Sequence, residues 1–325
     1  MTAASRAWKS GVPVEGPFRA GRDDIAGLNQ VFSDAFTERY RRDGMVGVRV
    51  PYLNPVVWRY AIDDAADGAL CWRDPRGEIA AFNMVHRSGA EGWMGPLAVR
   101  QDYQGSGVGK EIVRQGVEWL RATGATVIGL ETMPRTLDNI GFYSSLGFIP
   151  GRLTLTTTLE AASAPNPPRL FGRLSAAEQD HVLEECRALL DAMLPGYDHT
   201  RELVLTDELS LGDTVLLREG DRLVGFALCH TIPLVEGRPR EELRVLKLAL
   251  DDERHLEAMI AVLRDFARRS GTRRVAVRVQ GEYAAVYSRL IALGGRVRWS
   301  DLRMSLAGYE ERAPARGLVL SNWEI

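Results

Sequence analysis

The apolar positions near the start of the chain have the spacing of a helix. Ile25, Leu28, Phe32 and Phe36 recur every three or four residues. This period places them along one face of an α-helix. We therefore predict an amphipathic helix over residues 23–40.

Shorter apolar segments follow this helix and indicate strands. Residues 69–72 and 79–86 are separated by the turn sequence Asp-Pro-Arg-Gly of residues 74–77, which is typical of an antiparallel hairpin. Further strands of the first half are predicted over residues 92–99, 126–130 and 153–159.

Two more helices complete the pattern of the first half. The apolar residues from Val108 to Leu120 share one helical face, and this helix connects the strands over 92–99 and 126–130. A strand, a loop, a helix and a strand in that order form a crossover unit. A short helix over 138–146 ends at Gly147. The first half is therefore predicted to be a mixed α/β layer.

The second half repeats this order of elements. Ser175 and Glu178 form a capping box that opens a helix, and a hairpin turns at residues 220–221. The elements predicted after the first helix are strands over 214–218 and 223–230, a strand over 243–250, a helix over 253–269, a strand over 275–279 and a short helix over 282–293. The matching order predicts a tandem structural repeat. Two unrelated α/β domains that share an order of elements are the alternative.

A segment rich in alanine and proline divides the chain almost in half. Residues 161–168 break both periodicities and carry no long apolar side chain, as expected of an interdomain linker. We therefore expect two tandem α/β domains with mixed sheets, over residues 1–160 and 169–325.

Composition and charge exclude several classes of partner. A length of 325 residues with 45% hydrophobic content fits two globular domains. With 41 basic against 43 acidic residues, no overall field favours nucleic acid or an anionic membrane. Three scattered cysteines argue against a disulfide framework. Residues 1–11 lack the apolar core of a signal peptide, and no stretch approaches the roughly 20 apolar residues that span a bilayer. We expect a cytoplasmic protein without a nucleic-acid or membrane partner.

Three alternating glycines precede the helix that begins near Val108. Gly105, Gly107 and Gly109 lack Cβ atoms and therefore let successive backbone N–H groups approach a ligand closely. The start of the helix adds unpaired N–H donors and a partial positive charge. The loop is therefore expected to hold a pyrophosphate, and a glycine-rich turn without a ligand is the alternative.

Two other phosphate motifs fail on spacing and on position. A Walker loop requires Ser or Thr after its lysine, but Glu111 follows Lys110. The dinucleotide fingerprint spaces its glycines G-x-G-x-x-G and follows the first strand of a domain.

The run Gln104-Gly105-Ser106-Gly107-Val108-Gly109 resembles motif A, Q/R-x-x-G-x-G/A, of the GCN5-related N-acetyltransferases (GNAT). Gln101 replaces a proline that is frequent in this family, upstream of the loop donors. The resemblance implies tandem GNAT-like acyltransferase domains that use acetyl-CoA, or another acyl-CoA, as co-substrate. It implies that the pantetheine arm pairs with backbone groups of Leu97, Ala98 and Val99. It also implies that the pyrophosphate is held by Gln104, Gly105, Ser106, Gly107, Val108, Gly109 and Lys110.

A second motif resembles the same family. Residues 142–148, Phe-Tyr-Ser-Ser-Leu-Gly-Phe, match its FYxxxGF pattern, in which the tyrosine protonates the departing thiolate. The resemblance therefore implies that Tyr143 is the general acid, and a phenol with a pKa of about 10 is protonated at neutral pH. A core tyrosine with one satisfied hydroxyl is the alternative. Asn139 is a further candidate for a cofactor contact, and Thr136 occupies a position where the family often has asparagine.

A nucleophilic amine must lose a proton, so a base or a water chain is required. Glu131, directly after the strand over 126–130, is the candidate base, and a solvated carboxylate at a strand end is the equal alternative. By resemblance, a backbone N–H near Ala98 or Val99 would stabilise the oxyanion. The histidines are dispersed without a pair at ligand spacing, so no metal is expected.

The acceptor in this family meets the first helices and the strand ends opposite the cofactor. Aromatic residues suited to an apolar or cationic acceptor are present in those segments. Each of them alone is more often a core residue. They are Tyr40, Tyr52, Trp58, Trp72 and Trp93.

The second half lacks the glycine loop. Residues 251–256, Asp-Asp-Glu-Arg-His-Leu, follow the matching strand, and their carboxylates would repel a pyrophosphate. Tyr287 is interpreted as a remnant of the position of Tyr143. We predict that residues 1–160 form the catalytic acyl-CoA-binding domain, that residues 169–325 form a degenerate copy, and that each chain binds one cofactor.

These features predict an N-acyltransferase that moves an acetyl or other acyl group to a primary amine of a small molecule or a peptide. A homodimer is left open. A regulatory protein that binds acyl-CoA without turnover is the main alternative, although it would not need Tyr143 as a proton donor. An interaction scaffold without a cofactor is another. The tandem plan also resembles mycothiol synthase, in which the C-terminal half carries the activity.

Overall fold

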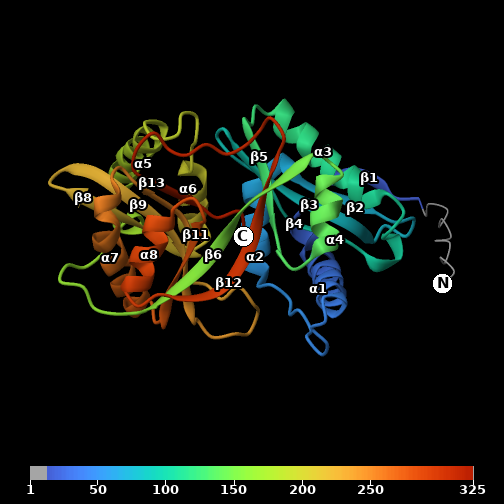
Figure 1. Cartoon of the computed structure of the whole chain (residues 1–325), viewed down its shortest axis with the longest axis horizontal. Coiled ribbons are helices and arrows are strands. Elements are labelled where there is room, and N and C mark those ends of the chain that lie inside the picture. Colours follow the sequence, from blue (N-terminus) through green and yellow to red (C-terminus); the bar gives the residue numbers. More distant parts are fainter. Residues whose placement is uncertain (1–12, 325) are drawn as a thin grey trace.

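The strands of both halves join one continuous sheet in the computed structural model, which describes residues 13–324 (Figure 1). The sequence prediction for residues 1–11 therefore concerns a segment outside the described residues. Within residues 13–324 the sheet has 13 strands, in the order β1-β2-β3-β4-β5-β12-β6-β11-β10-β9-β8-β7, with β13 paired to β10. The first half contributes β1 (Glu15–Arg19), β2 (Ala69–Arg73), β3 (Ile79–Ser88), β4 (Glu91–Val99), β5 (Val127–Thr132) and β6 (Phe148–Glu160). The second half contributes β7 (Arg169–Leu170), β8 (Gly212–Glu219), β9 (Arg222–His230), β10 (Glu242–Leu250), β11 (Arg274–Gln280), β12 (Arg296–Leu306) and β13 (Leu318–Ser321).

Most helices lie where the apolar spacing predicts them. They are α1 (Ile25–Arg42), α3 (Val108–Ala122), α4 (Leu137–Ser144), α5 (Ala176–Asp191), α7 (Leu256–Arg269) and α8 (Ala284–Ala292). The predicted capping box opens α5, where the Ser175 N–H donates to the Glu178 carboxylate at 2.8 Å. The order of elements in the two halves confirms the mixed α/β fold class.

The sequence analysis did not predict two of the helices, α2 (Pro55–Ala65) and α6 (Thr200–Glu208). Asn54 caps α2, because its side-chain oxygen accepts a hydrogen bond from the Val56 N–H at 3.1 Å. Trp58 and Ile62 are buried on one side of this helix, and Tyr60 is buried on the other. Its polar face is narrow, with Arg59 and Asp63 half-buried, so the helical period of its apolar residues is hard to recognise in the sequence.

The two halves exchange a strand with each other. β12 of the second half lies between β5 and β6, and its Arg303 pairs with Glu131 of β5. In return, β6 of the first half lies between β12 and β11, where Glu160 pairs with Arg274. Figure 1 shows β6 and β12 side by side across the middle of the molecule. Each half therefore completes its sheet with a strand from the other half.

The hydrophobic core is shared in the same way. One buried cluster joins Trp58 and Phe82 of the first half to Phe226 and Leu246 of the second. On this face α2 packs against α6. The opposite face of β3, β4 and β5 is covered by α3, through a separate cluster that includes Ile112. Within residues 13–324, none of the helices is both long and apolar enough to cross a membrane.

Candidate active site

The C-terminal end of β4 pairs with a neighbouring strand along one edge only. β4 and β5 run parallel but pair only from Glu91–Met94 against Val127–Leu130. Beyond Met94, β4 still pairs with β3, for example at Ala98. No strand among the described residues pairs with the β5-facing edge of residues 95–99. The predicted pantetheine contacts Leu97, Ala98 and Val99 therefore lie along an open backbone edge, apart from the Val99 carbonyl, which accepts from Gln104 Nε2 at 2.9 Å.

The glycine loop connects this edge to α3. Gly105 has a φ of +80° and Gly107 has a φ of +96°, so both lie in the left-handed region that side chains disfavour. A Cβ on either residue would meet no atom within 4 Å. These glycines are therefore required by the backbone conformation and leave space in front of the loop. Gly107 immediately precedes α3, whose first-turn N–H groups have no intrahelical acceptors.

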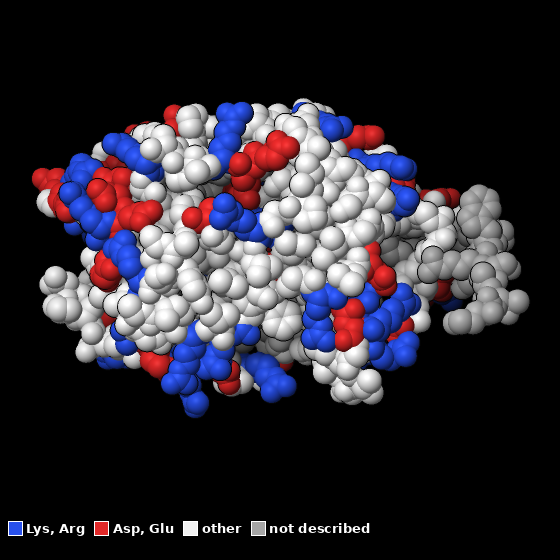
Figure 2. Space-filling model, viewed as in Figure 1, with Lys and Arg blue, Asp and Glu red and all other residues white. Residues whose placement is uncertain are grey.

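The two cations that flank the loop, Arg100 and Lys110, differ in their partners. Arg100 is engaged by Asp74 and Asp102, at 2.8 Å each. Lys110 is exposed and has no ion pair with any residue of the described chain. Figure 2 shows few charged side chains on the visible surface over α4, which lies beside the loop. The loop can therefore offer backbone donors and the Lys110 ammonium to an anion.

Tyr143 lies on α4 and shares a hydrophobic cluster with the β4 end and α3. The cluster contains Val99 and Ile112, and the Tyr143 ring packs against it, 6.1 Å from the Phe148 ring centroid. Gly109 of α3 approaches the same helix, since a Cβ there would lie 3.5 Å from the Phe142 ring. The structure thus brings the open edge, the loop and Tyr143 together on the α3 face of the sheet.

The hydroxyl of Tyr143 has no hydrogen-bond partner among residues 13–324. Burial raises the pKa of this phenol to about 12, so it is protonated throughout the neutral range. Asn139 is tied to the end of β5, because its side-chain amide donates to the Thr132 hydroxyl at 3.3 Å. Thr136 donates to the Asp43 carboxylate at 2.6 Å and so connects α4 to the end of α1.

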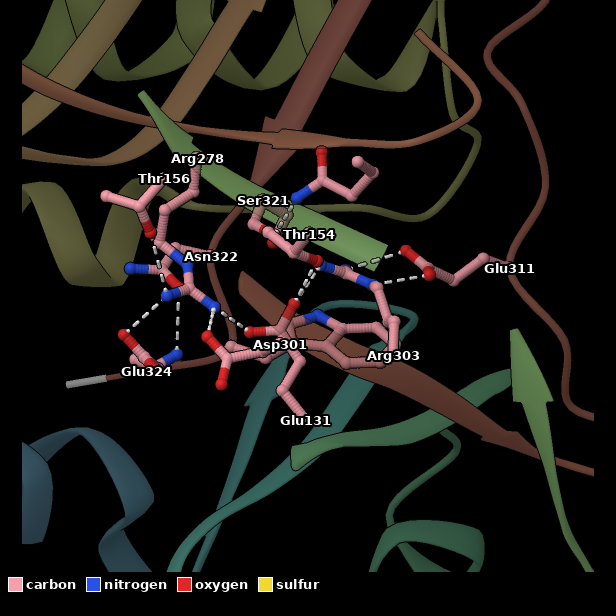
Figure 3. A network of polar contacts seen from close by, with 12 residues as sticks. Glu131, Thr154, Thr156, Arg278, Asp301, Arg303, Glu311, Ser321, Asn322 and Glu324 are labelled. Carbon is pink, nitrogen blue, oxygen red and sulfur yellow. Dashed lines mark hydrogen bonds and ion pairs between the residues drawn. The ribbon is translucent and has the colours of Figure 1, made fainter. Parts of the chain in front are cut away.

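Glu131 lies on the other face of the sheet. Its neighbour Leu130 belongs to the α3-side cluster, and consecutive side chains of a strand point to opposite faces. Glu131 accepts hydrogen bonds from the Thr154 hydroxyl at 2.5 Å and from Arg278 at 2.5 Å, and it pairs with Arg303 at 3.2 Å (Figure 3). Burial alone would raise the pKa of this carboxyl, but the two guanidiniums hold it below its ordinary value.

The aromatic candidates for the acceptor divide into two groups. Trp58, Trp72 and Trp93 are at most 4% exposed and belong to the core. Tyr52 is 39% exposed and Tyr40 is half-buried, so both can line a surface site.

The matching edge in the second half is covered. β10 pairs in parallel with β11 only at residues 242–244, and the rest of its length pairs with β13, from Lys247–Ser321 to Leu250–Leu318. In the following loop, Asp251 pairs with Arg222 and with His255, 3.4 Å away. Tyr287 packs against the hydrophobic cluster of this half.

Several residues of the seam between the halves carried no local sequence signal. Asp301 and Arg303 lie on β12, and Arg278 lies on β11. Each is a charged residue at an inward-facing position of a strand, and this is the single pattern that could have marked them. Within the described residues, no group of His, Cys, Asp and Glu side chains could hold a metal ion.

Comparison with known proteins agrees with this geometry. A model of the acetyltransferase (GNAT) family matches residues 29–148. No curated protein matches the chain significantly.

Solved structures share the fold over both halves. A putative acetyltransferase from Pyrococcus horikoshii has a TM-score of 0.67 at 16% identity, over 99% of this chain and 98% of that one. A tandem GNAT protein from the clavulanic acid biosynthesis pathway has a TM-score of 0.58 at 13% identity, over 90% and 98%. N-myristoyltransferase from Saccharomyces cerevisiae, solved with myristoyl-CoA, has a TM-score of 0.62 at 10% identity, over 98% and 87%. At these identities the likeness concerns the fold alone. Residues 29–148 thus match the acetyltransferase (GNAT) family, and the chain as a whole shares the fold of tandem GNAT proteins.

Proposed function

We propose that the first half binds an acyl-CoA and transfers its acyl group to a primary amine. A GNAT fold supports acyl transfer in general. The observation that carries the proposal is the free edge of β4 at Leu97–Val99, on the same face as the glycine loop and the unpaired hydroxyl of Tyr143. These three features fit the three parts of an acyl-CoA: the pantetheine arm, the pyrophosphate and the sulfur.

Different residues would bind the different parts of the acyl-CoA. Backbone groups of Leu97, Ala98 and Val99 would hold the pantetheine arm as a neighbouring strand would be held. Residues 104–110 would hold the pyrophosphate, through the N–H groups at the start of α3 and the Lys110 ammonium. Asn139 would position the turn of α4 through its hydrogen bond to Thr132.

In the transfer a C–N bond forms as the thioester C–S bond breaks, and the leaving thiolate needs a proton. Tyr143 would supply it, because its hydroxyl is protonated and has no other partner among the described residues. A backbone N–H near Ala98 or Val99 would stabilise the charge that develops on the carbonyl oxygen. Glu131 remains a candidate base, but a carboxylate held by two guanidiniums is a weak proton acceptor.

Two tyrosine variants test the proposal. Thiol release from acetyl-CoA is measured with a panel of primary amines for the wild type, Tyr143→Phe and Tyr287→Phe. We expect Tyr143→Phe to lower kcat by roughly 100-fold or more, the range of acid–base catalysis, with acetyl-CoA affinity retained. Tyr287→Phe is the matched control and should keep full turnover.

The same assay separates the alternative functions. An acyl-CoA-binding regulatory protein would bind acetyl-CoA without releasing thiol with any amine. A mycothiol-synthase-like enzyme would use the second half, where β13 covers the corresponding edge, so it predicts that Tyr287→Phe is the damaging change. Unchanged turnover in Tyr143→Phe would remove this residue as the acid.

A further inference from the structure

The end of the chain lies over the point where β4 and β5 separate. A Cβ on Gly129 of β5 would lie 2.1 Å from the Trp323 ring, and a Cβ on Gly95 of β4 would lie 3.7 Å from the Trp323 carbonyl oxygen. Gly129 alternates with Ile128 and Leu130, which face α3. Trp323 therefore covers the split from the face opposite to α3. An acceptor that reaches the split from this face would lie beside Trp323, because the proposed acyl-CoA contacts occupy the other face.

Polar side chains from the second half surround this point (Figure 3). Asp301 and Arg303 of β12 share a face with Glu131, since Arg303 and Glu131 are direct partners in the sheet. Arg278 of β11 binds Glu131, Asp301 at 3.0 Å and Glu324 at 2.8 Å. The strand exchange thus places residues of the second half within one network with the end of β5.

Anionic charge exceeds cationic charge in this network. Five carboxylates contact the two guanidiniums of Arg278 and Arg303; they are Glu91, Glu131, Asp301, Glu311 and Glu324. Two further positive charges adjoin the network, Arg244 near Glu324 and Lys247 paired with Glu91. If every carboxyl is ionised, one negative charge remains, and a proton or a cationic ligand can compensate it.

The carboxylates of the network differ in their exposure and in the number of guanidiniums that contact them. Glu131 binds two guanidiniums and the Thr154 hydroxyl. Glu324 has a side chain that is 47% exposed, so water screens it. Asp301 is 4% exposed, and it shares its one guanidinium with Glu131 and Glu324 and accepts from the Trp299 indole at 3.1 Å. Asp301 is therefore the buried carboxylate with the weakest cationic support.

Two further observations indicate a ligand at this place. The Nε–H of Arg278, whose side chain is 7% exposed, has no partner among the described residues, so a buried donor is unused. Tyr40 of α1 lies within electrostatic range of the network, since burial raises its pKa and the carboxylates of Asp301 and Glu324 raise it further. With Tyr40 and the half-exposed Trp299, the network presents anionic charge beside aromatic surface, as suits an ammonium group.

We propose that Asp301 of the second half is the proton acceptor for an amine that binds as its ammonium at the β4–β5 split, with Arg278 as its positioning residue. This inference rests on the proposed acyl transfer. The ammonium would give one proton to the Asp301 carboxylate, and the neutral amine would attack the thioester carbon. As the C–S bond breaks, the thiolate would take the proton of Tyr143, and the Tyr143 phenolate would take the second proton from the nitrogen, which leaves a neutral amide and a free thiol. In an acceptor that carries an oxygen near its amine, this oxygen would accept a hydrogen bond from the unused Arg278 Nε–H.

The ionisation of Asp301 agrees with this role. Burial and the carboxylates of Glu324 and Glu131 raise its pKa to about 7, although Arg278 opposes the shift. The other charged or titratable groups at the network are Arg303, Arg244, Glu91, Glu311 and Tyr40, and burial also raises the pKa of Glu311 to about 7. Because a base must be ionised to accept a proton, the rate should be low well below pH 7 and should rise through it.

The test compares Asp301→Asn and Asp301→Glu with the wild type, using phenethylamine and its weakly basic analogue 2,2-difluoro-2-phenylethylamine as acceptors. For Asp301→Asn we expect kcat/KM with phenethylamine to fall roughly 100-fold and its rise through neutral pH to disappear. The loss with the fluorinated amine should be much smaller, because that nitrogen is largely neutral without a base. Asp301→Glu should recover most of the rate.

Acetyl-CoA affinity and the unfolding midpoint serve as folding controls, and the exposed Asp221→Asn is the matched substitution. Unchanged kinetics in Asp301→Asn while the wild type is active would overturn the inference alone. Equal losses with both amines would also overturn it, because they would show a structural role. Thiol release with no amine at all from the wild type would overturn the proposed function, and this inference with it.

Discussion

β4 and β10 occupy the same place in their halves, but their far ends differ. Beyond Met94, one edge of β4 is free within the described chain, whereas residues 247–250 of β10 pair with β13. The backbone groups of a strand edge require partners. In the second half the chain supplies them with its own last strand. In the first half they remain available to an extended ligand such as a pantetheine arm.

The loops after β4 and β10 also differ in whether their backbone N–H groups are available to a ligand. In the first half, Gly105 and Gly107 hold the loop open with positive φ angles. In the second, Asp252 has an extended backbone and its carboxylate accepts from the Arg254 N–H at 2.9 Å. An aspartate side chain therefore occupies one of the donors that a phosphate would use. In the second half, backbone hydrogen-bonding groups have partners within the chain, whereas the matching groups of the first half are available to a cofactor.

The largest expected effect comes from weakening the cover over β10. Leu318 of β13 is fully buried, so Leu318→Ala should lower the free energy of unfolding by about 2–5 kcal/mol. Urea denaturation measures the change, with Val46→Ala as a control because Val46 is 81% exposed. A loss no larger than that of the control would mean that β13 is a loosely attached flap, and the contrast between the two edges would not hold.

A smaller effect is expected from closing the open loop. Gly107→Glu places a side chain at a φ of +96° and a carboxylate where the pyrophosphate would bind. Acetyl-CoA affinity should fall by at least about 30-fold, or about 2 kcal/mol, by calorimetry. The control is Gly124→Glu at the other end of α3, where φ is +91° and a Cβ would meet only the Arg87 guanidinium, 4.0 Å away. Equal affinity losses in the two variants would refute the assignment of the loop.

No new binding is expected from removing the carboxylates of the second loop. The variant with Asp251→Asn, Asp252→Asn and Glu253→Gln should bind one acetyl-CoA per chain, as the wild type should, because β13 still covers β10. Isothermal titration gives the stoichiometry. A second site in this variant would show that charge, and not the strand, keeps the second half empty.

The sequence predicted the elements better than their partners. Apolar spacing located β2 to β5, α3 and the repeat of the same order in the second half, because these signals are local. The exchange of β6 and β12 was missed, since strand order depends on contacts between distant residues. Glu131 shows the consequence: its arginine partners Arg278 and Arg303 are 147 and 172 residues away along the chain.

In the candidate site, too, the features with local sequence signals were predicted, and those that depend on distant contacts were not. The glycine loop and Tyr143 lie within short motifs, so the sequence could propose them. The covering of β10 by β13 and the position of Trp323 over Gly129 depend on where the last residues return to the sheet. Three of the five predicted acceptor aromatics are core residues, because aromatic side chains alone do not distinguish a site from an interior.

The reciprocal exchange of β6 and β12 also determines how the protein can be built. In connectivity the molecule is the single-chain equivalent of a strand-swapped dimer, in which each partner finishes the other. Residues 161–168 connect the two partners covalently, which makes their encounter intramolecular. A first half produced alone would lack β12 and would present unpaired edges on β5 and β6, the kind of surface through which chains aggregate. The two halves are therefore one folding unit, and we expect that the first half does not fold stably when it is produced without the second.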